Sequence, residues 1–142
     1  MSDIRKITIK GFSGYGPYDE AYEDKITLTT DSISYEYIPT VESEINPKRK
    51  WRYTTNSPIF STTYDRISKL IEEILQKEIE AFCTDIGGME FSLLYTNKSR
   101  VKKHYWLPAD HFYEVVKLIR TMVPQTEYTP AVLLLEEDFS DK

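Results

Sequence analysis

Two short stretches of the chain combine basic and aromatic residues, and these residue types are suited to binding a charged partner. In each stretch four cations lie beside aromatic residues: Lys48, Arg49, Lys50 and Arg52 around Trp51, and Lys98, Arg100, Lys102 and Lys103 before His104, Tyr105 and Trp106. Cations can hold phosphates, and aromatic rings on a sheet can stack on bases. The candidate binding residues are therefore Lys50, Trp51, Arg52, Arg100, Lys102, His104 and Trp106.

Other features of the sequence favour a protein as the partner. The chain of 142 residues has 23 acidic and 18 basic side chains and a net charge of −5, whereas nucleic-acid-binding modules are usually strongly basic. Its 11 tyrosines suit protein contacts, although tyrosine also suits strands. Lysines can also serve only to protect strand edges, and the tryptophans can be core residues. We favour a domain that binds a protein, with nucleic-acid or phosphate binding through the two basic-aromatic strands as the alternative.

The residues that could support catalysis or bind a metal are few. Zinc sites usually need four ligands, but the chain has only His104, His111 and Cys83 as nitrogen or sulfur donors. Cys83 with a histidine base could act as a nucleophile in principle, but a lone cysteine is more often a small buried hydrophobe. We therefore expect no metal, cofactor or catalytic activity. That the protein is an enzyme is our third interpretation, after protein binding and nucleic-acid or phosphate binding.

A glycine-containing segment runs from Gly11 to Tyr22. Its spacing, with glycines at 11, 14 and 16, matches neither the dinucleotide-binding fingerprint nor the phosphate-binding P-loop. Asp19 and Glu20 follow and would repel a phosphate. We interpret the segment as a loop whose role the sequence leaves open.

Period-two alternation of apolar residues predicts the strands. It places one strand around Ile7 and Ile9, a hairpin from Ile26 to Ile38, a strand over Trp51 to Thr55, and a second hairpin over Met89 to Tyr95 and Val101 to Leu107. Apolar residues at spacings of three and four predict helices from about Thr63 to Lys77, capped by Thr62, and from Pro108 to Pro124.

These elements predict an α+β fold with a single antiparallel sheet, built in the order four strands, helix, two strands, helix. Each helix has one apolar face, so both should pack on the same face of the sheet. The residues expected to face the sheet are Ile67, Ile71, Ile74, Phe112, Val116 and Ile119. We expect a single domain over residues 1–135 and a frayed acidic tail over residues 136–142. Val132 to Leu135 should form a last strand or a packed arm.

The sequence also predicts the cellular compartment of the protein. The longest apolar run, Ala131 to Leu135, is far shorter than the ~20 residues of a membrane helix. The N-terminus lacks a signal-peptide profile. The single cysteine excludes an internal disulfide and fits a reducing compartment. We therefore expect a cytoplasmic protein without membrane association.

The two basic strands could form one surface under one condition. Alternate side chains of a strand point to opposite faces of the sheet. If the helices cover one face, the other face would carry Lys50, Arg52, Lys102, His104 and Trp106. These residues would form one positive patch provided that the two strands are neighbours, which the sequence does not establish.

Overall fold

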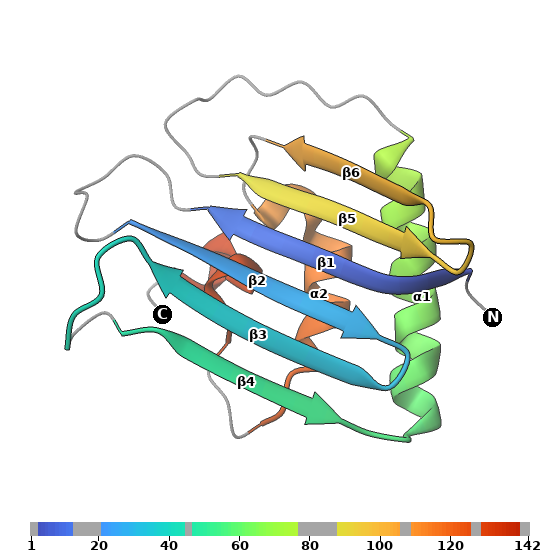
Figure 1. Cartoon of the computed structure of the whole chain (residues 1–142), viewed down its shortest axis with the longest axis horizontal. Coiled ribbons are helices and arrows are strands. Elements are labelled where there is room, and N and C mark those ends of the chain that lie inside the picture. Colours follow the sequence, from blue (N-terminus) through green and yellow to red (C-terminus); the bar gives the residue numbers. More distant parts are fainter. Residues whose placement is uncertain are drawn as a thin grey trace.

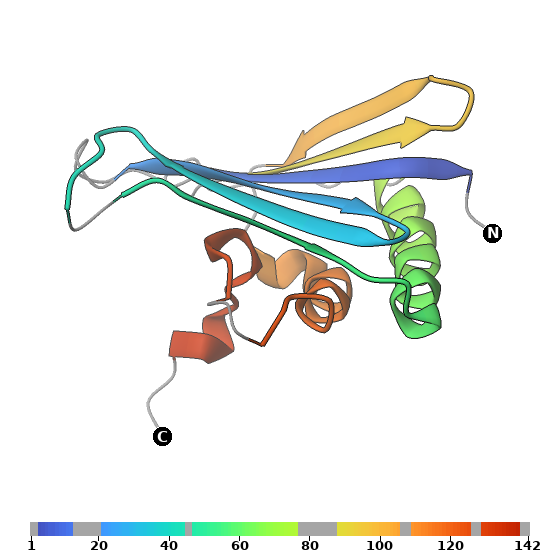
Figure 2. The same ribbon diagram turned by 60° about the horizontal axis from the view of Figure 1, so that its bottom comes forward.

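The computed structural model describes residues 3–12, 21–44, 47–76, 88–105, 109–125 and 129–139. The strands form one six-stranded antiparallel sheet in the order β4-β3-β2-β1-β5-β6, with the helices on one face (Figures 1 and 2). The elements are β1 Ile4–Phe12, β2 Tyr22–Thr29, β3 Ser32–Pro39, β4 Arg49–Thr54, α1 Pro58–Leu75, β5 Met89–Tyr95, β6 Arg100–Tyr105 and α2 Tyr113–Arg120. The predicted α+β fold and element order are confirmed.

The sheet divides its side chains between an apolar face and a polar face. Ile9 pairs with Ile26 on β2 and with Phe91 on β5, and all three side chains are completely buried. Their neighbours Lys10 and Thr8 point to the opposite side. Each strand therefore contributes alternate residues to the core and to an open face that the helices leave uncovered.

Helix α1 begins well before the predicted Thr63. Ser57 is the N-cap, and Pro58 occupies the first turn, where its missing N–H costs no hydrogen bond. The predicted cap Thr62 lies inside the helix and donates from Oγ1 to the Pro58 carbonyl at 2.8 Å. Lys77 lies outside the described residues. In the described ranges, neither helix is both long and apolar enough to cross a membrane.

The predicted core stripe is confirmed, with one residue at its margin. Ile67, Ile71, Phe112, Val116 and Ile119 are buried, and Ile74 is partly buried against the same cluster. A 3₁₀ turn, η2 (Ala109–Phe112), leads into α2, which ends at Arg120 before the predicted stop at Pro124. Pro108 lies outside the described residues.

The segment after α2 packs under the sheet as an arm and forms no strand in the described ranges. It contains two 3₁₀ turns, η3 (Ala131–Leu133) and η4 (Glu136–Phe139). Val132, Leu133 and Leu135 are buried, and η3 packs against β1 and β2 (Figure 2). Arg120 holds η4 through a bidentate contact with Asp138 at 3.0 and 3.1 Å. Residues 140–142 lie outside the described part of the chain.

Candidate functional site

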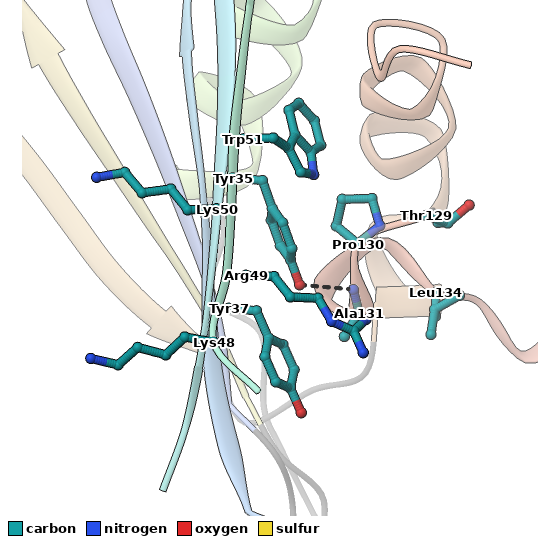
Figure 3. Close-up of a pocket in the computed structure, with 10 residues that line it drawn as sticks. All are labelled: Tyr35, Tyr37, Lys48, Arg49, Lys50, Trp51, Thr129, Pro130, Ala131 and Leu134. Carbon is teal, nitrogen blue, oxygen red and sulfur yellow. Dashed lines mark hydrogen bonds between the residues drawn. The ribbon is translucent and has the colours of Figure 1, made fainter. Parts of the chain in front are cut away.

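The alternation of cations and aromatics in β4 separates them in space. Trp51 pairs with Tyr35 in the sheet, and their rings lie 5.8 Å apart on the face that the helices cover. Lys50 pairs with Glu36, whose side chain belongs to the open face. Figure 3 shows Lys50 directed away from Trp51, on the other side of the strand. Lys50 and Arg52 therefore lie on the face opposite Trp51 and Tyr53. Arg49 is the exception in β4, since it lies on the same side as Trp51 and contacts the Tyr37 ring.

In β6 the aromatic Tyr105 belongs to the core, and Lys103, on the same side of the strand, lies 5.4 Å from the centre of its ring. Tyr105 is 3 % exposed and donates its hydroxyl hydrogen bond to the Ile74 carbonyl at 3.2 Å. Lys102 and His104 lie on the open face against Glu90, with contacts of 3.1 and 3.8 Å. Trp106 lies outside the described residues.

The two basic strands do not satisfy the condition for a shared patch. β4 and β6 form the two opposite edges of the sheet, with four strands between them. At the usual strand spacing their axes are about 24 Å apart. The reason is that β1 is central and pairs with both β2 and β5, so the sheet grows outward from it in both directions.

The residues between these edges on the open face were not selected from the sequence. Lys6 and Lys10 on β1 and Lys25 on β2 point to this face, where Lys10 is directly opposite Lys25. The signal that could have found them is the alternation of Lys6, Thr8 and Lys10, which already placed these residues on the polar side of the first strand. The information that was missing is the central position of β1.

A cavity of about 560 Å³ lies on the helix side of β4, between the strand and the C-terminal arm. Its sheet wall is formed by Tyr35, Tyr37 and Trp51, and Arg49 lies 5.6 Å from the centre of the Tyr37 ring (Figure 3). The opposite wall comes from the arm: Thr129, Pro130, Ala131 and Leu134. Trp51 is thus half-buried as the wall of a cavity, and it is neither a fully buried core residue nor a ring on the basic face.

A second cavity, of about 480 Å³, lies at the other end of the same strand. Tyr53, Ile59 and Phe60 line one side, and the residues directly after α2, from Thr121 to Gln125, line the other. Ile59 is 79 % exposed and Tyr53 is 42 % exposed. Trp51 and Tyr53 are two positions apart on one strand, so each contributes to one of two neighbouring cavities.

A buried carboxyl group holds the arm that forms the wall of the first cavity. Asp24 Oδ2 accepts hydrogen bonds from the Tyr35 hydroxyl and the Val132 backbone N–H, both at 2.8 Å. Burial raises the pKa of Asp24 to about 6, and these hydrogen bonds oppose part of that rise. Gly11 faces Asp24, and a Cβ there would lie 2.5 Å from Asp24 Oδ1. Asp24 therefore anchors the arm, and glycine is needed at position 11 for this close approach.

The described residues offer no metal centre, because no three His, Cys, Asp or Glu side chains among them could share an ion. Cys83, which we considered as a nucleophile, lies outside the described part of the chain. Gly14 and Gly16 also lie outside it.

Comparison with known proteins adds little to this geometry. No protein-family model and no curated protein matches the sequence. One solved structure that is similar is an SsgA-like sporulation-specific cell division protein from Thermobifida fusca, with 11 % identity and a TM-score of 0.26 over 88 % of this chain and 87 % of that one. A likeness at this level assigns no function to this protein.

Proposed function

We propose that this protein is a non-enzymatic domain that binds an extended, acidic segment of a partner protein along the outer edge of β4. The observation that carries the proposal is the combination of features at this one strand. Within the described residues β4 pairs only with β3, its aromatic side faces two cavities, and its other side carries Lys50 and Arg52.

An edge strand can bind a peptide as an additional strand of the sheet. Backbone hydrogen bonds then supply affinity, and pockets for alternate side chains supply specificity. On β4 the two cavities lie beside Trp51 and Tyr53, so every second residue of an added strand would enter or cover a cavity. The residues between them would lie on the open-face side, beside Lys50 and Arg52. The matching segment alternates large apolar and acidic side chains.

Charge also selects among the possible occupants of this edge. Lys48, Arg49, Lys50 and Arg52 give β4 and the residue before it four cations, and Arg49, Lys50 and Arg52 are exposed. A second copy of this chain would bring a second row of cations against the first, and like charges directly opposite one another destabilise a strand pair. An acidic segment would gain from the same charges, which also guide partners into register.

The nucleic-acid alternative gains less from this geometry. It requires bases to stack on aromatic rings while nearby cations hold the phosphates. In β4 only Arg49 lies on the same side as the rings, whereas Lys50 and Arg52 lie on the opposite face. In β6 the described aromatic residue, Tyr105, is buried. A purely protective role for the edge lysines would explain the cations but not the two cavities or the exposed Ile59.

The test is fluorescence anisotropy with two labelled peptides of equal composition. One alternates glutamate with leucine or phenylalanine, and the other has the same residues with the acids and apolar residues in separate blocks. We expect the alternating peptide to bind at least ten times more tightly. Trp51→Ala should weaken its binding by about tenfold or more. Val101→Ala, at the opposite edge of the sheet, should leave it unchanged.

Two outcomes would overturn the proposal. One is equal binding of the alternating and the blocked peptides, which would reduce the interaction to net charge. The other is an equal loss of affinity in Trp51→Ala and Val101→Ala, since Val101 is 42 % exposed on β6 and far from both cavities.

A further inference from the structure

The centre of the open face contains a polar depression that is separate from the β4 edge. Its volume is about 340 Å³. We call it the basic cradle, and its lining residues are Lys6, Thr8, Lys10, Lys25, Thr27, Glu90, Ser92, Arg100 and Lys102. We propose that the basic cradle binds a compact anion that carries several phosphate groups, such as a short polyphosphate chain or a multiply phosphorylated small molecule.

Strand register gives the basic cradle a floor of short hydroxyl side chains. Thr8 on the central strand is directly opposite Thr27 on one side and Ser92 on the other. Lys6 and Lys10 flank Thr8 along β1. Lys102 is directly opposite Ser92, so a cation stands at that end of the row of hydroxyl residues. Short hydroxyls let an anion approach the sheet closely and can donate hydrogen bonds to it, while the long cations surround it.

The charges in the basic cradle are only partly compensated within the described part of the chain. Glu90 is paired with Lys102 at 3.1 Å, and Lys10 lies 3.9 Å from Glu23. No ion pair of the described residues involves Lys6, Lys25 or Arg100. The depression is thus locally positive on a chain whose net charge is −5.

Two lysines of the basic cradle are neighbours across strands. Lys10 and Lys25 are directly opposite each other in the β1–β2 ladder and point to the same face. An acid lies opposite each lysine on its other side, Glu90 beside Lys10 and Glu36 beside Lys25, and these acids partly offset the repulsion between the two cations. The paired lysines thus present two adjacent cations to an anion bound at the centre of the sheet.

The lining residues also indicate the class of anion. None of them is aromatic, so the basic cradle provides no ring on which a base could stack. Lysine and arginine with hydroxyl donors suit phosphate oxygens. Along β1 the spacing from Lys6 to Lys10 is about 13 Å, which is more than one phosphate group spans. These features favour several linked phosphates over a single phosphate or a nucleic-acid strand.

Isothermal titration calorimetry with sodium tripolyphosphate tests the proposal, with inorganic phosphate and a single-stranded oligonucleotide compared at equal ionic strength. We expect tripolyphosphate to bind at least tenfold more tightly than inorganic phosphate. Lys25→Gln combined with Arg100→Gln should weaken tripolyphosphate binding by tenfold or more. The matched control is Lys50→Gln with Arg52→Gln, which removes the same charge from the same face outside the basic cradle and should change binding less than twofold.

Thermal melts provide a second measurement. Tripolyphosphate should raise the melting temperature of the wild-type protein, and Lys25→Gln should reduce this rise. The proposal is overturned if the control pair loses as much affinity as the cradle pair. It is also overturned if tripolyphosphate binds no better than phosphate, or if the oligonucleotide binds more tightly than tripolyphosphate. None of these results would depend on the peptide binding proposed for β4.

Discussion

The two edges of the sheet have similar compositions but different surroundings. β4 carries Lys50 and Arg52, and β6 carries Arg100 and Lys102. At β6 the aromatic Tyr105 is buried between Phe91 and Phe112, and Lys102 is paired with Glu90. At β4 the aromatic Trp51 and Tyr53 line cavities, and no ion pair of the described residues involves Lys50 or Arg52.

This difference comes from what lies behind each strand. η2 and the end of α1 fill the space behind β6, where Phe112 and the Ile74 carbonyl contact Tyr105. Behind β4 the arm and residues 121–125 after α2 approach the strand but leave two cavities. A basic-aromatic strand therefore becomes a core edge or a candidate binding edge according to its packing, and residue composition alone does not distinguish the two.

The largest expected effect tests this contrast with one tyrosine from each edge. Tyr105→Ala removes a buried ring and should lower the free energy of unfolding by about 3–5 kcal/mol. Tyr53→Ala, at a 42 % exposed position, should lower it by less than about 1 kcal/mol and weaken binding of the alternating peptide. Urea unfolding followed by circular dichroism measures both. Equal losses of stability would contradict the difference between the two edges.

Local patterns were sufficient to predict most of the fold. The alternation of Ile7 and Ile9 identified β1 and its buried face, and the stripe of Ile67 and Ile71 identified the buried face of α1. These features depend on residues a few positions apart. The predicted start of α1 near Thr63 was wrong. The prediction relied on Thr62 as the helix cap, whereas the helix begins at Pro58 after the N-cap Ser57.

The candidate site could be predicted less completely, because strand order depends on contacts between distant segments. The sequence identified Lys50 and Arg52 as outward residues of one strand, and Lys102 as an outward residue of another. It did not indicate that β1 lies between them with Lys6 and Lys10. The cavities beside Trp51 were also beyond reach, since their far walls come from residues about 70 or more positions later in the chain.

The next effect concerns pH and is specific to the half of the sheet that holds the arm. The pKa of Asp24 is about 6 in the folded protein, above its value in the unfolded chain. The folded state therefore retains the proton to higher pH, and the stability conferred by protonated Asp24 is lost as pH rises from about 4 through about 6. The full change is about 3 kcal/mol. Asp24→Asn should remove this dependence of stability on pH.

The measurement is the difference in unfolding free energy between Asp24→Asn and the wild-type protein at several pH values, which cancels the effects of other carboxyl groups. We expect this difference to shift in favour of the variant by about 2–2.5 kcal/mol between pH 4 and pH 7.5, because part of the full change occurs below pH 4. Tyr35→Phe removes a hydrogen bond that lowers the pKa of Asp24, so it should move the transition to higher pH. A difference that does not change with pH would show that Asp24 does not titrate as a buried group.

The smallest effect on stability gives the sharpest contrast between the two edges. Lys102 contacts Glu90 at 3.1 Å, and the Glu90 side chain is only 12 % exposed. Lys102→Glu replaces this attraction with a repulsion between two carboxylates, so it should lower the free energy of unfolding by about 1 kcal/mol. Arg52→Glu, opposite Ser34, should change stability by less than about 0.5 kcal/mol.

Binding of the alternating acidic peptide should change in the reverse order, with a loss of tenfold or more in Arg52→Glu and less than twofold in Lys102→Glu. Thermal melts and anisotropy on the same two variants measure both quantities. A stable Arg52→Glu variant with unchanged peptide affinity would show that the cations of β4 only protect the edge.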